Sequence, residues 1–120
     1  MSATRIGLGK RGEQLAAEFY IREGYRILEQ NFRSPIGEVD LIVEKSGLLV
    51  FVEVKSRSSE LFGEGYEAVN KAKQARLRRL ATLYLRQTRL SYSGIRFDVV
   101  SLLITREGEL IKLKHFSAAF

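Results

Sequence analysis

Asp40, Glu53 and Lys55 are charged residues inside the most apolar part of this sequence, GEVDLIVEKSGLLVFVEVKSR (residues 37–57). Carboxylates of this kind can hold a divalent cation, which polarises a phosphodiester and makes hydroxide available from water near neutral pH. Lys55 would then stabilise the negative charge that develops on phosphate in the transition state. The alternative is structural, because Lys55 could instead form an ion pair with Glu38 or Glu53 at the sheet surface.

The spacing of these residues favours a metal site if the segment folds as a hairpin. A two-residue Ser-Gly turn at 46–47 would place Asp40 directly opposite Glu53, and Glu38 opposite Lys55, all on one face. Opposed carboxylates repel each other, and a divalent cation between them removes that penalty. A three-residue turn would separate the carboxylates. The predicted apolar face consists of Val39, Leu41, Val43, Val50, Val52 and Val54.

The composition restricts which metal such a site could hold. The sequence has no cysteine and a single histidine, which excludes thiolate sites and the common zinc clusters. Oxygen ligands remain, and they favour Mg²⁺ or Mn²⁺. No apolar run is long enough for a signal peptide or a membrane span, so we expect a cytoplasmic protein.

Basic residues are concentrated between Lys71 and Arg89, a segment with seven Lys and Arg side chains and no acidic residue, in a chain whose net charge is +6. Such a segment favours a polyanionic partner, and we expect DNA, with RNA as the alternative and no membrane. A solvated helix face is the structural alternative. The residues predicted to bind nucleic acid are Lys71, Lys73, Gln74, Arg76, Arg78 and Arg79, together with Arg57.

Two of these predicted contacts have structural alternatives of their own. Gln74 could contact a phosphate or position a water at the metal, and a plain helix-surface glutamine is nearly as good an interpretation. Arg57 follows the second strand of the hairpin, where it could bind phosphate or simply solvate the strand end.

Periodicity predicts one domain over residues 1–120, with residues 1–8 as a flexible tail. The apolar spacing predicts a helix over 10–23 that stops at Gly24, and a second helix over about 68–87 after a glycine-containing loop at 58–66. Apolar strands on both sides of the second helix favour an α/β sheet covered on both faces. The predicted strands are 25–32, 38–45, 48–55, 95–105 and 109–116.

Six blocks between residues 9 and 100 resemble a known family: GKRGEQLAAEFY, GYRILEQNFR, GEVDLI, FVEVKSR, AVNKAKQARL and RFDVV. The chain is similar to the YraN-like family, small bacterial proteins regarded as predicted endonucleases. They belong to the PD-(D/E)XK nuclease superfamily and are related in fold to archaeal Holliday junction resolvases. The resemblance implies a restriction-endonuclease-like αβββαβ core, with a central mixed sheet flanked by helices.

The resemblance also implies roles for individual residues. Asp40 and Glu53 would bind Mg²⁺ or Mn²⁺, Lys55 would assist, and the helical acid Glu13 would reach the same metal. From the sequence alone, Glu13 could equally be a solvated acid favoured by the helix dipole. Asp98 is not expected to be a metal ligand.

The predicted function is therefore a Mg²⁺-dependent endodeoxyribonuclease, with branched or junction DNA as a candidate substrate. A junction substrate would favour a symmetric homodimer. The alternative is a non-catalytic nucleic-acid-binding or assembly module on the same fold, and an RNA-directed nuclease is a third hypothesis. His115 is expected to have a structural role rather than that of a catalytic base.

Overall fold

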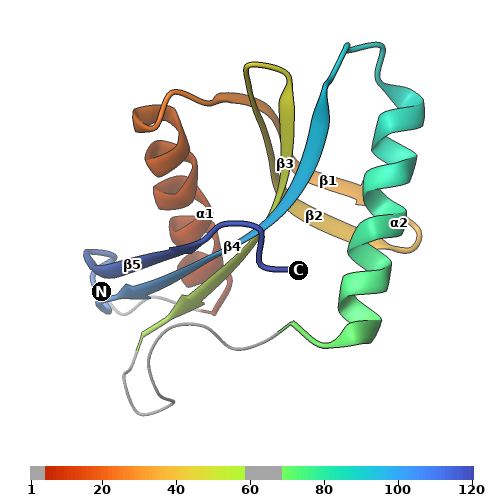
Figure 1. Ribbon diagram of the computed structural model, residues 1–120. Helices are drawn as coiled ribbons and strands as arrows, with labels where there is room; N and C mark the ends of the chain where they lie inside the picture. The colour runs from red at the N-terminus through yellow and green to blue at the C-terminus, as the bar shows by residue number, and fades with distance from the viewer. Residues whose placement is uncertain (1–4, 59–68) are drawn as a thin grey trace.

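The computed structural model describes residues 5–58 and 69–120, which form two helices and five strands in the order α-β-β-β-α-β-β (Figure 1). The predicted order of elements is confirmed. Residues 1–4 and most of the predicted loop, from residue 59 on, lie outside the described residues. The elements are α1 (Arg5–Arg22), β1 (Arg26–Ser34), β2 (Gly37–Lys45), β3 (Leu48–Arg57), α2 (Lys71–Gln87), β4 (Gly94–Ile104) and β5 (Leu110–Phe116).

The helix α1 begins earlier than the sequence predicted. Residues 5–8, which were expected in a flexible tail, are helical because Leu8 packs against the apolar cluster beneath α1. The helix ends where predicted, since Gly24 has a φ of +91°, a left-handed conformation that glycine adopts readily. Among the described residues, no helix is both long enough and apolar enough to cross a membrane.

The five strands form one mixed sheet in the order β1-β2-β3-β4-β5. Neighbouring strands are antiparallel except β3 and β4, which run parallel. A parallel pair needs a crossover connection, and α2 lies on that connection. Asn70 caps the start of α2, because its side-chain oxygen accepts a hydrogen bond from the Lys73 backbone N–H at 2.8 Å.

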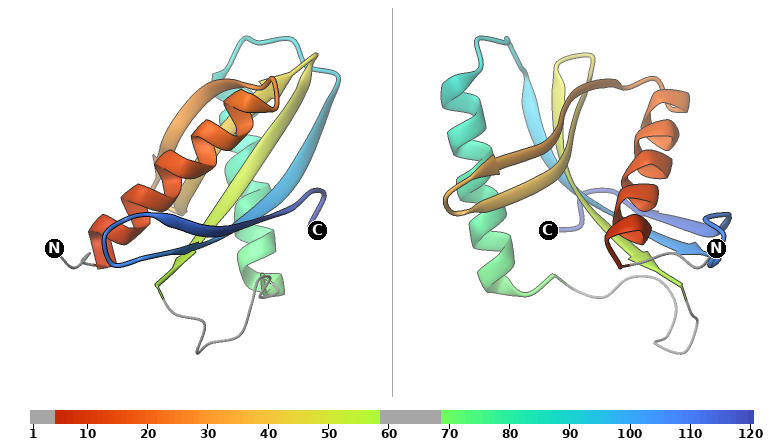
Figure 2. Two further views of the ribbon diagram at one scale, coloured as in Figure 1. Left: turned by 90° about the vertical axis from the view of Figure 1, so that its left-hand side faces the viewer. Right: turned by 180° about the vertical axis from the view of Figure 1, so that it is seen from behind.

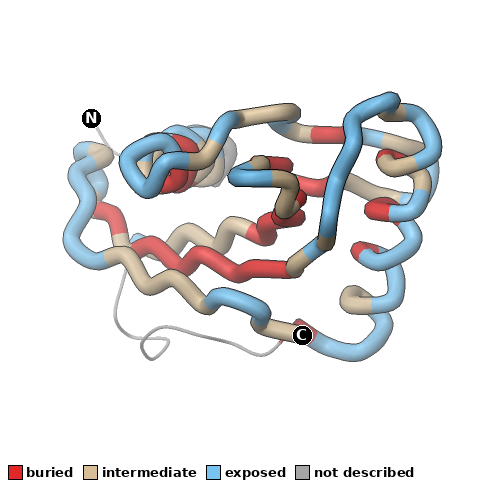
Figure 3. Tube along the Cα trace, turned by 45° about the horizontal axis from the view of Figure 1, so that its top comes forward, coloured by how far each residue is buried: buried red, intermediate tan, exposed pale blue. Residues whose placement is uncertain are grey.

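The two helices cover opposite faces of the sheet, as predicted, and Figure 2 shows the sheet between them from two further sides. Each helix closes its own apolar cluster. Ala16 and Tyr20 of α1 pack on one face, and Leu77, Leu80 and Tyr84 of α2 pack on the other. Figure 3 shows that the buried part of the chain runs along the strands, whereas much of the outer surface of α2 is exposed.

The hairpin between β2 and β3 has the predicted two-residue turn. Ser46 and Gly47 both have positive φ, +50° and +85°, and Lys45 pairs with Leu48. The predicted apolar face needs two corrections. Leu41, Val43, Val50 and Val52 are buried beneath α1, but Val39 joins the cluster beneath α2, and Val54 is only partly buried.

Candidate metal centre

Asp40 lies where β2 and β3 stop pairing. Its Oδ2 accepts a hydrogen bond from the backbone N–H of Val54 at 2.8 Å. In a continued ladder that N–H would bond to Val39, and the described pairing instead ends at Leu41 and Val52. Beyond this point β2 turns toward α2 while β3 runs the other way (Figure 1). The side chain of Asp40 thus replaces a backbone bond and is held in a fixed orientation.

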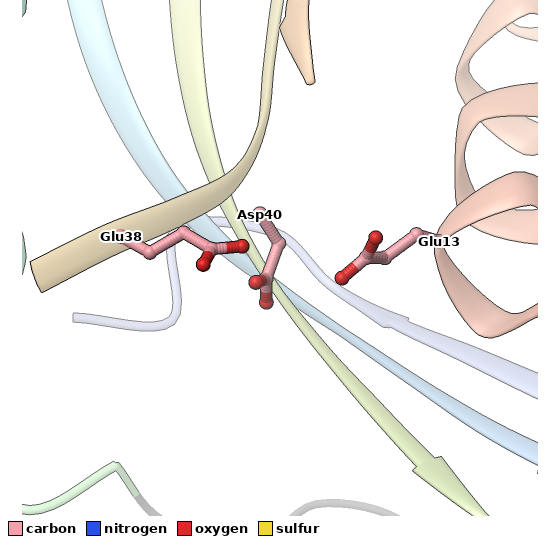
Figure 4. A group of neighbouring side chains, drawn as sticks. All are labelled: Glu13, Glu38 and Asp40. Carbon is pink, nitrogen blue, oxygen red and sulfur yellow. The ribbon is translucent and has the colours of Figure 1, made fainter. Parts of the chain in front are cut away.

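Three carboxylates from two elements meet at this position. Glu38 and Asp40 come from β2 and Glu13 comes from α1, and each offers an oxygen within 4.8 Å of the others. Figure 4 shows the three side chains pointing toward one another. All three are partly buried. Hard divalent cations prefer such an all-oxygen donor set, so this cluster could bind a metal ion.

A close approach between α1 and β3 brings Glu13 to this cluster. Gly12, the residue before it, is buried against Ser56, and a Cβ at Gly12 would lie 1.7 Å from Ser56 Oγ. Every other residue type carries a Cβ, so either the Ser56 hydroxyl would have to rotate away or the helix would have to move from the strand. The glycine therefore permits the close approach that brings Glu13 to face Asp40.

The electrostatics of the cluster favour a proton or a cation at Asp40. Burial raises the pKa of Asp40 from 3.8 to about 7, and the neighbouring charges of Glu53, Glu13 and Glu38 add to the rise, whereas the Val54 N–H opposes it. A divalent cation would relieve both the burial and the repulsion. The charge of Glu53 is the largest of these three contributions. Asp40 and Glu53 are not the directly opposed pair that the sequence predicted, because the described pairing ends at Leu41 and Val52.

Glu53 itself is bound by a lysine. The Lys73 Nζ of α2 donates to Glu53 Oε1, and Glu53 is 8% exposed. Glu53 lies outside the group of three carboxylates that meet within 4.8 Å among the described residues. Its predicted role as a metal ligand stays a prediction. This ion pair connects β3 to the basic helix α2.

Asn31 of β1 also reaches the cluster. Its Nδ2 donates to Glu38 Oε1 at 2.8 Å and to Glu13 Oε1 at 3.1 Å. Beside it, α1 and β1 line a groove of about 150 Å³ that gives access to Glu13. The groove is polar, and its walls are formed by Lys10, Glu13, Gln14, Gln30 and Asn31.

The remaining predicted catalytic and phosphate-binding residues of the hairpin lie on β3. Lys55 and Arg57 are partly buried, and alternation along the strand places them on the same side as Glu53. Their predicted roles toward phosphate stay predictions.

The predicted nucleic-acid-binding residues of α2 divide into two groups. Lys71, Arg76 and Arg79 are exposed. Arg78, also exposed, stacks its guanidinium over Phe97 and Phe120, at 5.2 and 5.5 Å from the ring centroids. Two residues have contacts inside the protein: Lys73 binds Glu53, and Gln74 Nε2 donates to the Val69 carbonyl at 2.7 Å.

Asp98 forms a separate buried network. Its carboxylate accepts hydrogen bonds from Tyr20 Oη, Arg96 and the Ala118 N–H, and it contacts His115 Nε2 at 2.8 Å. Burial raises the pKa of Asp98, but these partners outweigh it and hold the pKa below its usual value. The network ties α1, β4 and β5 together, which fits structural roles for Asp98 and His115.

The comparisons with known proteins place the chain in a family. The model of the Uncharacterised protein family UPF0102 matches residues 12–102. The chain belongs to this family. UPF0102 is the YraN family, so the resemblance predicted from the sequence is confirmed. The restriction-endonuclease-like fold is also confirmed, since a five-stranded mixed sheet and two helices form such a core.

Relatives in the UPF0102 family cover nearly the whole chain. A UPF0102 protein of Pelotomaculum thermopropionicum is 42% identical over 120 residues, 100% of both chains. One from Syntrophomonas wolfei is 46% identical over 113 residues, 94% of this chain and 96% of the relative. Among solved structures, that of Pyrococcus furiosus SfsA in complex with Ca²⁺ matches with a TM-score of 0.42 and 18% identity, covering 87% of this chain and 60% of SfsA.

Sequence reasoning missed two residues of the cluster in this UPF0102 chain. The sequence placed Glu38 on the same face as Asp40 but predicted that it pairs with Lys55. A second acid two residues before Asp40 was the signal that could have identified Glu38 as part of the cluster. Asn31 gave a weaker signal, because an asparagine inside a strand suggests a local irregularity without saying what it contacts. The contact of Lys73 was readable, since Lys73 precedes the buried Leu77 by one helical turn and so faces the sheet.

Proposed function

We propose that this UPF0102 chain is a divalent-metal-dependent endonuclease that hydrolyses phosphodiester bonds of DNA. The convergence of Glu13, Glu38 and Asp40 is the observation that carries the proposal. A purely structural protein gains nothing from three carboxylates within 4.8 Å, because their mutual repulsion destabilises the fold. A site that binds a cation turns this repulsion into affinity.

The donor set fits Mg²⁺ or Mn²⁺, with Asp40, Glu13 and Glu38 as ligands and Glu53 as a further one once Lys73 moves from it. When bound, the cation supplies Lewis-acid polarisation of the phosphodiester and a lowered pKa of water. The chain supplies orientation. The Val54 N–H fixes the Asp40 carboxylate at one oxygen, which leaves the other oxygen for the cation.

The basic residues would act on the phosphates. A cluster of carboxylates repels a DNA backbone, so substrate binding needs compensating positive charge nearby. The exposed side chains Lys71, Arg76 and Arg79 of α2 could supply it through phosphate contacts. Lys55, on the Glu53 side of β3, would stabilise charge that develops on the scissile phosphate.

The test is a cleavage assay on single-stranded, duplex, flap and four-way DNA, with Mg²⁺, with Mn²⁺ and with chelator. The parent should cut at least one of these substrates only with metal, and Glu13→Gln should lower the rate by about a hundredfold or more. Glu18→Gln is the matched control, because Glu18 lies on the same helix but is exposed and outside the cluster.

The alternative function is a non-catalytic nucleic-acid-binding module, and the same samples distinguish it. Such a module would bind DNA with strong salt dependence yet neither bind a divalent cation nor cut any substrate. That outcome would refute the nuclease proposal. Preferential cutting of four-way DNA would support a junction substrate and a dimer, which sedimentation on the same protein would test.

A further inference from the structure

Asn31 joins the two glutamates of the acidic cluster. Its Nδ2 donates to Glu13 Oε1 at 3.1 Å and to Glu38 Oε1 at 2.8 Å. Both acceptors are carboxylates, so the nitrogen of the amide faces them rather than its oxygen. An amide nitrogen has two hydrogens, and here each glutamate takes one.

The backbone at Asn31 is shaped for this contact. Asn31 has a φ of +54°, a left-handed conformation inside β1. The pairs on either side of it continue the register between β1 and β2, which places Asn31 across from Asp40. Asparagine adopts the left-handed region more readily than most residues. A left-handed residue within a strand redirects its side chain, and here the amide is directed between α1 and β2.

The Asn31 amide reduces the repulsion among the carboxylates in the metal-free protein. The carboxylates of Glu13, Glu38 and Asp40 lie within 4.8 Å of one another and repel. A shared donor offsets that repulsion and removes rotamer freedom from two long side chains. Glu13 thereby keeps its Oε2, whereas Oε2 of Glu38 accepts a hydrogen bond from Nε of the exposed Arg33 at 3.3 Å.

From this geometry we infer that Asn31 is a positioning residue of the metal centre. Its amide holds Glu13 and Glu38 together in the metal-free protein and orients them for a divalent cation. The inference rests on the proposed function, since it assigns the cluster the role of binding a metal. Asn31 also lines the polar groove of about 150 Å³ beside Glu13, so a hydrated cation entering there meets an assembled site.

Two substitutions at Asn31 separate the amide from the backbone. Asn31→Gly removes the amide but accepts the left-handed φ without strain. Asn31→Asp keeps the shape and replaces a donor with an acceptor, so four carboxylates then meet. Gln30→Ala is the control, because Gln30 lines the same groove and is exposed.

Metal binding is measured by calorimetric titration with Mg²⁺ and with Mn²⁺, without any substrate. We expect Asn31→Gly to bind about tenfold more weakly or worse, as is typical when a group that orients a ligand is lost. Gln30→Ala should bind like the parent. In chelator, the melting temperature of Asn31→Asp should fall below that of the parent, and saturating Mg²⁺ should narrow the difference. A merely structural asparagine would leave that difference unchanged.

Nuclear magnetic resonance on the metal-free protein gives an independent readout. The side-chain amide signals of Asn31 should shift when Glu13→Gln or Glu38→Gln replaces one acceptor, and again when Mg²⁺ is added. If the parent binds the cation and Asn31→Gly binds it equally well, the inference alone is overturned. If the parent binds no divalent cation, the proposed function fails and the inference fails with it.

Discussion

Replacing Asp40 by asparagine should stabilise the metal-free protein at neutral and alkaline pH. The introduced amide has nearly the same shape as the carboxylate, and its oxygen could still accept the Val54 N–H bond that Asp40 accepts at 2.8 Å. The substitution removes one negative charge from a partly buried site that also contains Glu13, Glu38 and Glu53. Loss of that charge, rather than a new contact, is the source of the expected gain.

The pKa of Asp40 sets the size of this effect. It rises from 3.8 to about 7 on folding, and each pKa unit corresponds to about 1.4 kcal/mol, so ionised Asp40 lowers the unfolding free energy by at most about 4 kcal/mol. Water reaches this partly exposed side chain and reduces the cost. We therefore expect Asp40→Asn to gain about 2 to 4 kcal/mol in chelator at pH 8.

The pH dependence gives this prediction its sign. Below 3.8 the carboxyl is protonated in both the folded and the unfolded chain, so parent and variant should differ little. Between 3.8 and about 7 the folded chain keeps a proton that the unfolded chain releases, so the stability contribution of Asp40 falls as pH rises. Above about 7 the loss is complete. The variant lacks this slope.

Urea unfolding in chelator from pH 4 to pH 8 measures both quantities. Glu107→Gln is the control, because Glu107 is exposed in the turn before β5 and should leave the slope unchanged. Added Mg²⁺ should stabilise the parent through binding and release a proton from Asp40 near pH 7, and Asp40→Asn should gain much less. A variant that is less stable than the parent at pH 8, or a difference that is constant with pH, would refute the reasoning.

Two further predictions concern the frame around the site. Gly12→Ala should destabilise the protein by about 1 to 3 kcal/mol and weaken Mg²⁺ binding. Adding Ser56→Ala to this variant should recover part of both losses, since Ser56 Oγ is the obstructing atom. Equal Mg²⁺ affinity in the parent and in Gly12→Ala would contradict this. Asp98→Asn should lose about 3 kcal/mol in urea unfolding, because the partly buried Arg96 would lose its charged partner, while Mg²⁺ affinity stays that of the parent. A loss below about 1 kcal/mol would argue against this network as a support of the fold.

The sequence predicted the fold because its signals are local. Alternation identified the strands, and the Ser46-Gly47 turn fixed the register of β2 and β3. Gly24 marked the end of α1 in the same way. The start of α1 was missed because tertiary packing of Leu8 decides it, and tertiary packing overrides propensity.

The composition of the site was only partly predictable. Regular pairing would have placed Glu38 opposite Lys55, but the described pairing ends at Leu41 and Val52, where the side chain of Asp40 takes the Val54 N–H. Periodicity assumes a regular strand and carries no information about such a bond. For the same reason it could not place Asn31, whose left-handed backbone breaks the alternation on which the prediction rests.

The fold accommodates these carboxylates without a metal because a partner or a proton lowers the electrostatic cost of each one. Lys73 neutralises Glu53, the Asn31 amide is shared by Glu13 and Glu38, and Asp40 keeps its proton up to a pH of about 7. The hydrogen bonds of the cluster leave one oxygen of Glu13 and one of Asp40 for a cation, whereas both oxygens of Glu38 are engaged, one by Asn31 and one by the exposed Arg33. A protein that needed only stability would reach it more simply with apolar side chains at these positions. The arrangement keeps three acids within 4.8 Å of one another, with Glu53 held separately by Lys73. Under the proposed function, a divalent cation would replace these partners and supply the chemistry that phosphodiester hydrolysis requires.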